Sequence, residues 1–406
     1  MTDLEQQLKE TYAERLDTLG PTGGDVGAAR RDGARMRMRR RLGVGVAAVV
    51  VVAVGAAGSL LGTGRLTVGP SHDVGHWREL PAPPLSPRAF AQSVWTGSEV
   101  VVLGGEEQPC PPNADCAGLP EDLRDGAAYN PVSDSWRRIP PAPVPVGPGD
   151  RLLAADGVVV LRDWQQDGSR WFTYEPDHNR WSRIDDVPAD IGDLPSAYGS
   201  RVYALVGRRV AVYDVRSFQW SLLPPDTKQR LVQRRVTATP YGPVVTGYVT
   251  LIGTQTAVSA HLYDGTSWHR LPPTSIAGND WAWAGGGMVD FDSYQHQGMD
   301  RMLPGVSLGG TLDPSTGRSA SLPTSALETP PDGWSLNAVG PGPWAASWGL
   351  VYDVAHRKAW TLSQPDGAPD DGVAAAWADG RLLAFGGVDH SPDGAEPTNH
   401  AWLYTP

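Results

Sequence analysis

The two cysteines are the first residues whose type and spacing suggest chemistry. Cys110 and Cys116 stand in the segment "CPPNADC" and are the only cysteines of the 406-residue chain. A zinc site would need two further ligands at a recognisable spacing, and none is found nearby. A redox C-x-x-C motif is absent as well. In an oxidising compartment this pair predicts a disulfide that closes a short loop.

Three long polar segments contain the other side chains that could bind a ligand. They span residues 106–126, 290–302 and 388–399, and the candidate residues within them are Asp115, Glu121, Asp290, Asp292, His296, Asp389 and His390. Carboxylates could bind calcium, but the spaced Asp and Gly pattern of a calcium loop is missing. The histidines stand alone. We therefore expect solvated binding loops, and no catalytic, cofactor or metal site.

A repeated phrase indicates which elements position these loops. "YNPVSDSWRRIPP" starts at Tyr129, "YEPDHNRWSRID" at Tyr174 and "YDVRSFQWSLLPP" at Tyr213, and in each the Trp follows seven residues after the Tyr. Further copies start at residues 263, 312 and 352, and the copy at 312 has Ser319 in place of its Trp. Two short apolar runs joined by a tight turn precede the phrase. Each unit of ~40–55 residues is thus predicted to form four antiparallel strands.

The two ends of the repeated region are incomplete in complementary ways. Six complete units occupy residues 89–364, and a seventh begins at Gly372 but supplies only three strands before the chain ends on "HAWLYTP". The segment "GHWRELPAPP", residues 75–84, has a Trp phrase without its Tyr strand. We expect this N-terminal strand to pair with the last strand. The predicted fold is all-β, a ring of seven blades without a long open edge.

The repeat resembles the kelch repeat family over about residues 72–406. The resemblance rests on Gly104-Gly105 and Gly386-Gly387 after an apolar strand, then the Tyr, then the Trp. It implies a kelch-like β-propeller whose tryptophans pack between blades, namely Trp77, Trp136, Trp181, Trp220, Trp268 and Trp360. The kelch fold also hosts copper radical oxidases similar to galactose oxidase. Those need a Tyr cross-linked to a Cys, and here the disulfide is expected to use both cysteines.

Apparent enzyme motifs coincide with the repeat. "RRIP" at 137–140 resembles the Arg-Ile-Pro of sialidases, and "DGTSWHRL" from Asp264 resembles their Asp-box, yet both belong to the Tyr–Trp phrase. No base–nucleophile or metal-ligand set is recognisable. We therefore expect a non-enzymatic binding module for a protein or glycan. A hydrolase or oxidase that uses the loop face of the propeller is the alternative, since a fold does not define a function.

The first 71 residues have a different character. Residues 1–41 contain an amphipathic helical pattern followed by seven Arg, and Leu42 to Leu61 form an uncharged run of twenty residues. At 1.5 Å per residue this run spans ~30 Å, so residues 42–62 predict a transmembrane helix with the N-terminus in the cytoplasm. A cleaved signal peptide, whose apolar core is shorter, is the alternative. Residues 63–71 would form a linker to the extracytoplasmic domain at 72–406.

The charge distribution limits the partners. Residues 1–41 have a net charge of +2, from nine basic and seven acidic residues. The remainder therefore has a net charge of −13, because the whole chain has a net charge of −11. An acidic domain disfavours nucleic acid as a partner. The Arg run suits anionic lipid headgroups, so we expect membrane lipid to contact residues 30–61. A role in topology alone is the alternative for this run.

Overall fold

The computed structural model describes the part of the chain that forms the repeats. The described residues are 75–109, 122–165, 168–189, 191–192, 194–226, 231–249, 257–291, 306–322, 334, 336–347, 349–391 and 394–406. They belong to one compact unit that comprises Gly64–Pro109 and Pro120–Pro406. In these residues all regular structure is β-strand. The predicted cytoplasmic helix, transmembrane helix and linker (1–41, 42–62, 63–71) lie outside the described residues. Within the described ranges, no helix has the length and apolarity to cross a membrane.

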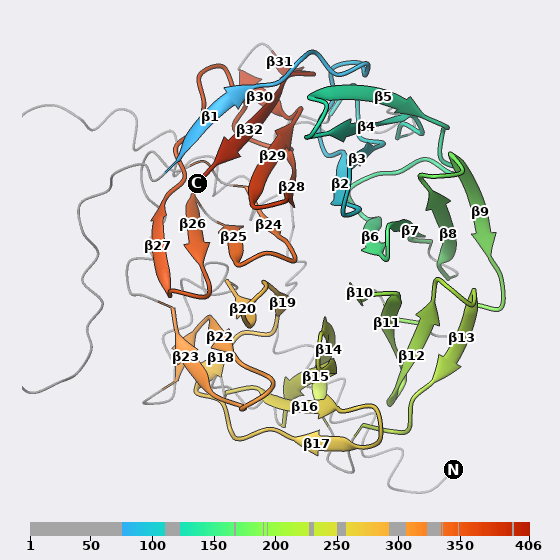
Figure 1. Cartoon of the computed structure of the whole chain (residues 1–406), viewed down its shortest axis with the longest axis vertical. Helices are drawn as coiled ribbons and strands as arrows, with labels where there is room; N and C mark the ends of the chain where they lie inside the picture. The colour runs from blue at the N-terminus through green and yellow to red at the C-terminus, as the bar shows by residue number, and fades with distance from the viewer. Residues whose placement is uncertain are drawn as a thin grey trace, which may run out of the picture. The chain divides into compact units, whose positions relative to one another are not determined.

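Seven four-stranded antiparallel sheets form the blades of a β-propeller (Figure 1). Blade 1 consists of β2 (Gln92–Trp95), β3 (Val100–Leu103), β4 (Gly126–Asn130) and β5 (Ser135–Ile139). Blade 2 consists of β6 (Arg151–Ala155), β7 (Val158–Asp163), β8 (Arg170–Glu175) and β9 (Arg180–Ile184). Blade 3 consists of β10 (Ser196–Tyr198), β11 (Arg201–Val206), β12 (Arg209–Asp214) and β13 (Gln219–Leu222). Blade 4 consists of β14 (Val232–Thr239), β15 (Gly242–Tyr248), β16 (Ser259–Tyr263) and β17 (Trp268–Arg270).

The last three blades follow the same plan. Blade 5 consists of β19 (Ala282–Trp283), β20 (Met288–Asp290), β22 (Gly310–Leu312) and β23 (Ser319–Ser321). Blade 6 consists of β24 (Ala338–Val339), β25 (Trp344–Ser347), β26 (Leu350–Asp353) and β27 (Lys358–Thr361). Blade 7 consists of β28 (Ala374–Ala378), β29 (Arg381–Phe385), β32 (Ala401–Thr405) and β1 (His76–Glu79). Two accessory pairs are β18 (Ile276–Ala277) with β21 (Ser307–Leu308), and β30 (Val388–Ser391) with β31 (Gly394–Pro397).

Blade 7 confirms the predicted closure of the ring. Its outer strand β1 comes from the start of the described chain and pairs antiparallel with β32, with Trp77 opposite Tyr404. The copy without a Trp is confirmed as well, because Ser319 stands opposite Leu312 as Trp136 stands opposite Tyr129. The repeat pattern thus corresponds to seven blades, of which blade 7 is completed by strands from both ends of the described chain.

The core lies between the blades. Val101 and Leu103 of blade 1 form one cluster with Val159 and Leu161 of blade 2, and all four are fully buried. Sheets that are covered on both faces favour continuous apolar strands over alternating ones. This explains the "VVVL" of β3, in which every residue is buried.

The repeated Tyr and Trp form a cross-strand pair that also joins blades. The ring centroids are 5.1–5.2 Å apart in Tyr129–Trp136, Tyr174–Trp181, Tyr213–Trp220, Tyr263–Trp268 and Tyr404–Trp77. Three of the indoles donate a hydrogen bond to a backbone carbonyl just past the outer strand of the preceding blade. These bonds are Trp77 to Ser363 (2.7 Å), Trp181 to Pro140 (2.9 Å) and Trp268 to Pro224 (2.9 Å).

Two details differ from the sequence interpretation. Trp77 packs against the core between blades, as expected, but it is only half-buried, because β1 is the outermost strand of its blade. Trp360 stands eight residues after Tyr352, so it pairs with Val351 while Ala359 lies opposite Tyr352. One extra residue turns a side chain to the other face of a strand. Trp360 therefore contacts Trp344 of its own blade, at 5.7 Å between ring centroids, instead of Tyr352.

The double glycines join consecutive blades through the backbone. The Gly105 N–H donates to the Val146 carbonyl, and the Gly387 N–H donates to the Arg88 carbonyl, each at 2.9 Å. Gly104 and Gly386 have φ of 70° and 64°, the left-handed region that glycine adopts without strain. A Cβ on either would come within 2.5 Å of the Val146 or Arg88 carbonyl oxygen. Glycine is therefore required where the next blade begins.

Candidate functional site

A cavity of about 890 Å³ occupies the centre of the ring. Its wall contains residues from the innermost strand of every blade, namely β2, β6, β10, β14, β19, β24 and β28. Figure 1 shows these strands facing the centre. The innermost strands of different blades do not pair with one another, so their free edges face a central space. Pockets of this size suit a small ligand or part of a larger one.

Two aromatic rings that line this cavity, Tyr198 and Trp283, form a cluster with Tyr241 beside it, and we name these three rings the aromatic mouth. Tyr198 ends β10, Trp283 ends β19, and Tyr241 lies in the turn between β14 and β15. Trp283 meets Tyr198 at 6.3 Å and 85°, and Tyr241 at 6.2 Å and 79°, both edge to face. Tyr198 is 37% exposed and Tyr241 is 48% exposed. Because the three rings contact one another and two of them are exposed, they form a candidate binding surface.

The polar groups of the cavity wall carry both signs of charge. Arg151, Arg235, Asp156 and Asp280 all line the cavity. Asp156 pairs with Arg216 at 2.6 Å, and this hydrogen bond lowers the pKa of the Asp156 carboxyl. Because the charges are mixed, the cavity is suited to a ligand that presents hydrogen-bonding groups and apolar faces rather than a large net charge.

The candidates from the polar segments lie elsewhere. Asp290 was expected on an exposed loop, but it is 0% exposed at the end of β20, so it cannot contact a ligand in solution. The Asp389 carboxylate accepts a hydrogen bond from the Asp370 backbone N–H at 3.1 Å, and His390 lies 3.7 Å from Asp371. Both contacts attach the β30–β31 hairpin to the segment before β28.

The remaining candidates cannot be placed. Cys110, Asp115, Cys116, Glu121, Asp292 and His296 lie outside the described residues, so the disulfide and the roles of these loop residues stay predictions. Among the described residues, no three His, Cys, Asp or Glu side chains are grouped so that they could hold a metal ion.

The aromatic mouth and the expected loop face lie at opposite ends of the blades. Antiparallel strands reverse direction at each turn, so the first and third turns of a blade lie at one end and the second connection lies at the other. The mouth residues adjoin first turns, whereas the described parts of the expected loop segments, 106–109, 122–126, 388–391 and 394–399, belong to second connections. Sequence reasoning missed the mouth. Its signal is an aromatic residue one or two positions before a turn glycine, as in Tyr198-Gly199, Tyr241-Gly242 and Trp283-Ala284-Gly285.

Fold and site together define the class of protein. The chain contains an all-β, seven-bladed propeller, a fold consistent with a binding module, with an aromatic-rimmed central cavity. No protein-family model matches the chain. No curated protein matches it either.

Proposed function

We propose that this protein is a non-enzymatic binding module that holds a glycan at the aromatic mouth. The observation that supports the proposal is the pair of exposed rings, Tyr198 and Tyr241, packed edge to face on Trp283 beside a central cavity. Such rings offer flat apolar faces and a hydroxyl or indole N–H at the edge. A sugar ring matches both features, because its C–H face stacks on an aromatic ring while its hydroxyls form hydrogen bonds.

The charge of the cavity wall supports a neutral ligand. Arg151, Arg235 and Asp280 line the cavity together with Asp156, which is paired with Arg216, so an anion or a cation would meet a group of the same sign. An extended polysaccharide could enter a central cavity end-on, whereas a folded protein could contact only the rim. A protein partner is the competing result that the binding experiment would reveal.

The setting we propose is a membrane-anchored, kelch-like propeller outside the cytoplasm. The uncharged run 42–61 behind seven Arg supports a single-pass anchor whose N-terminus is cytoplasmic, with lipid contacts through residues 30–61. The double glycines, each followed by the Tyr–Trp pair, support the kelch-like assignment in blades 1 and 7. In an extracytoplasmic setting Cys110 and Cys116 would be oxidised to a disulfide.

Calorimetric titration of the full chain in mild detergent tests the proposal. The probes are tetrasaccharides of the cello-, chito-, malto- and manno- series. We expect one series to bind, and Trp283→Ala to weaken that binding about tenfold or more through the lost stacking face. Trp164→Ala is the matched control, because Trp164 is 46% exposed and follows β7 at the other end of its blade.

Two results would contradict this function. One is the absence of binding by all four series. The other is a Trp283→Ala chain that keeps the wild-type melting temperature and the wild-type affinity. Release of shorter sugars during the titration would instead favour a hydrolase.

A further inference from the structure

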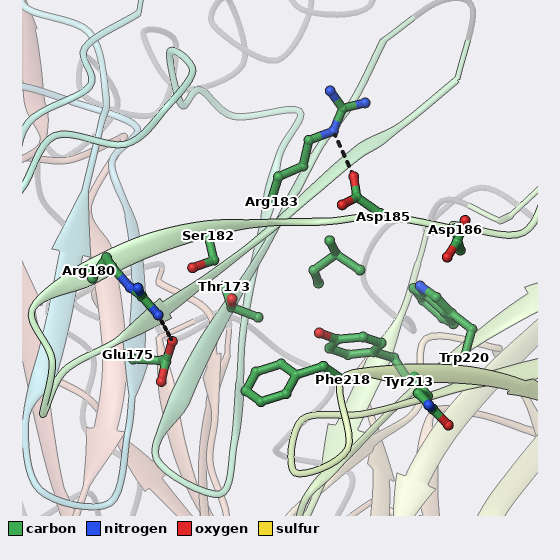
Figure 2. Close-up of a pocket in the computed structure, with 12 residues that line it drawn as sticks. Thr173, Glu175, Arg180, Ser182, Arg183, Asp185, Asp186, Tyr213, Phe218 and Trp220 are labelled. Carbon is green, nitrogen blue, oxygen red and sulfur yellow. Dashed lines mark ion pairs between the residues drawn. The ribbon is translucent and has the colours of Figure 1, made fainter.

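A second hollow of about 620 Å³ lies between blades 2 and 3, away from the innermost strands (Figure 2). Blade 2 contributes side chains from β8, β9 and the segment after β9, and blade 3 contributes the turn and strands around Phe218. Figure 2 shows Tyr213, Phe218 and Trp220 on one side and the residues of β9 on the other. Three departures from the repeat meet in this groove.

The first departure is the indole of Trp220. In blades 2, 4 and 7 the repeated Trp donates to a carbonyl of the preceding blade, whereas Trp220 Nε1, like Trp136 Nε1 of blade 1, is buried without a hydrogen-bond partner in the described residues. Its ring instead meets Trp171 of blade 2 edge to face at 5.5 Å and 86°. Trp171 pairs with Ile184 as Gly126 pairs with Ile139 in blade 1.

The second departure is the hydroxyl of Tyr213. In blades 1 and 2 the corresponding hydroxyls donate to a turn side chain, Tyr129 to Asp134 at 2.6 Å and Tyr174 to Asn179 at 2.8 Å. Blade 3 has Phe218 at that turn position, which offers no acceptor. The Tyr213 hydroxyl consequently has no hydrogen bond to the described residues. Burial, with a contribution from Glu175, raises its pKa to about 12, so it stays a neutral donor.

The third departure is Phe218 itself. Its φ is 57°, close to the 49° of Asp134 and Asn179, and Asn and Asp tolerate this left-handed region far better than bulky residues do. The ring is also 55% exposed. A strained backbone and an exposed ring cost stability, and such costs are characteristic of functional sites. At this turn position the sequence therefore has an exposed aromatic ring in place of a residue that favours the left-handed conformation.

The charged groups around the hollow largely neutralise one another. Arg180 lies 3.5 Å from Glu175, and Arg183 lies 3.7 Å from Asp185. Only Asp186 among the charged lining residues has no ion pair in the described structure. The groove therefore offers an aromatic face, two donors without acceptors, and paired charges that can accept or donate hydrogen bonds.

We propose that the groove between blades 2 and 3 is a second ligand site, which binds a single neutral sugar ring. The sugar stacks on Phe218, and its hydroxyl oxygens accept from Trp220 Nε1 and the Tyr213 hydroxyl. This site is separate from the aromatic mouth, and either one can exist without the other.

The indole N–H resonance of Trp220 provides a readout confined to this site. In the ¹H–¹⁵N spectrum of the full chain, the Trp220→Phe variant assigns that resonance by its disappearance. The probes are glucose, galactose, mannose and N-acetylglucosamine, added to ~10 mM, tenfold above a Kd of ~1 mM. We expect a saturable shift of the Trp220 signal with at least one of them.

Phe218→Asn is the decisive variant, because it restores the residue that Asn179 supplies in blade 2. We expect its melting temperature to equal or exceed that of the wild type, since Asn relieves the left-handed strain. The Tyr213 hydroxyl regains an acceptor. Because the stacking face is lost, the sugar affinity measured from the Trp220 shift should fall about tenfold or more. The control Trp283→Ala should keep the shift, which separates this site from the aromatic mouth.

The proposal is overturned if no sugar shifts the Trp220 resonance in the wild type. It is also overturned if a stably folded Phe218→Asn chain shows the same shift as the wild type. Loss of the shift in Trp283→Ala with an unchanged melting temperature would assign the sugar to the aromatic mouth and likewise overturn it.

Discussion

At the scale of single residues, the Asp or Asn after the repeated Tyr forms the turn between the last two strands of a blade. The side chain accepts a backbone N–H two residues further on, as Asn130 does from Val132 and Asp214 does from Arg216. In blade 4 the backbone N–H groups of Ser267 and Thr266, together with His269, lower the pKa of Asp264 to about 2. Short polar side chains favour such local bonds, which explains the recurring Tyr-Asp and Tyr-Asn pairs.

His261 of β16 is a buried residue whose protonation should influence stability. Asp226, Arg234 and Arg270 face it, and Arg234 forms an ion pair with Asp226 at 2.7 Å. Burial lowers the pKa of His261; Asp226 opposes this shift, and Arg270 and Arg234 add to it. Because the folded-state pKa lies below the unfolded value of about 6.5, the folded state binds fewer protons. Stability should be constant above that value and decrease as the pH falls below it.

We expect the melting temperature to fall less between pH 7 and pH 5 in His261→Phe than in the wild type, because the phenyl ring cannot be protonated. Calorimetric scans at a series of pH values would measure both slopes. Equal slopes for His261→Phe and the wild type would exclude the proposed linkage.

At the scale of elements, adjacent blades are joined by backbone and side-chain bonds as well as by apolar packing. The double glycines of blades 1 and 7 donate backbone hydrogen bonds to the segment that leads into the next blade. The indole hydrogen bonds of Trp77, Trp181 and Trp268 add a second link between blades. Each sheet has two faces to cover, so these junctions determine whether the sheets assemble.

Two glycines of blade 7 allow the cost of a strained backbone to be distinguished from the cost of a steric clash with a neighbouring segment. Gly386 and Gly380 have similar φ, 64° and 74°, but a Cβ on Gly386 would lie 2.5 Å from the Arg88 carbonyl oxygen, whereas nothing lies within 4 Å of one on Gly380. Left-handed backbone alone costs about 1–2 kcal/mol for an alanine, so Gly380→Ala should lower the free energy of unfolding by about that amount. Gly386→Ala should lower it further. Urea unfolding curves that show the same loss for both variants would refute the steric explanation.

At the scale of the whole propeller, one strand closes the ring. β1 covers the edge of β32, Trp77 donates to Ser363, and Asn399 Nδ2 donates to the Leu85 carbonyl at 3.0 Å. His400 lies 2.6 Å from Glu79 across the same pair of strands. These contacts join segments that are about 300 residues apart, so blade 7 depends on both ends of the described chain.

Removal of this strand should open the seam. A chain that begins at Pro87 lacks β1 and leaves β32 as an unpaired edge, which is a site for aggregation. We expect it to melt at a lower temperature and to form oligomers in size-exclusion chromatography, whereas a chain that begins at Ser71 should stay monodisperse. If both chains melt equally high and equally cooperatively, the closure does not stabilise the ring.

The sequence alone determined the strands, the number of blades and the strand that closes the ring. These follow from local patterns, namely the apolar runs, the turn residues and the Tyr–Trp spacing, together with the complementary incompleteness of residues 75–84 and 400–406. The same reasoning located the exception at Ser319, because a missing Trp is visible within a single repeat.

Only the tertiary structure decided which side chains meet. Tyr198, Tyr241 and Trp283 come from blades 3, 4 and 5, and the spacing within one repeat says nothing about how rings from three repeats gather. The burial of Asp290 depends on its neighbours in space in the same way. The groove between blades 2 and 3 became recognisable only when Trp220 and Phe218 were compared with the residues at the same positions in other blades. A missing hydrogen bond can be identified only in a structure that shows where its partner lies in the other blades. Local patterns specify strands and turns, whereas sites arise where separate repeats come into contact.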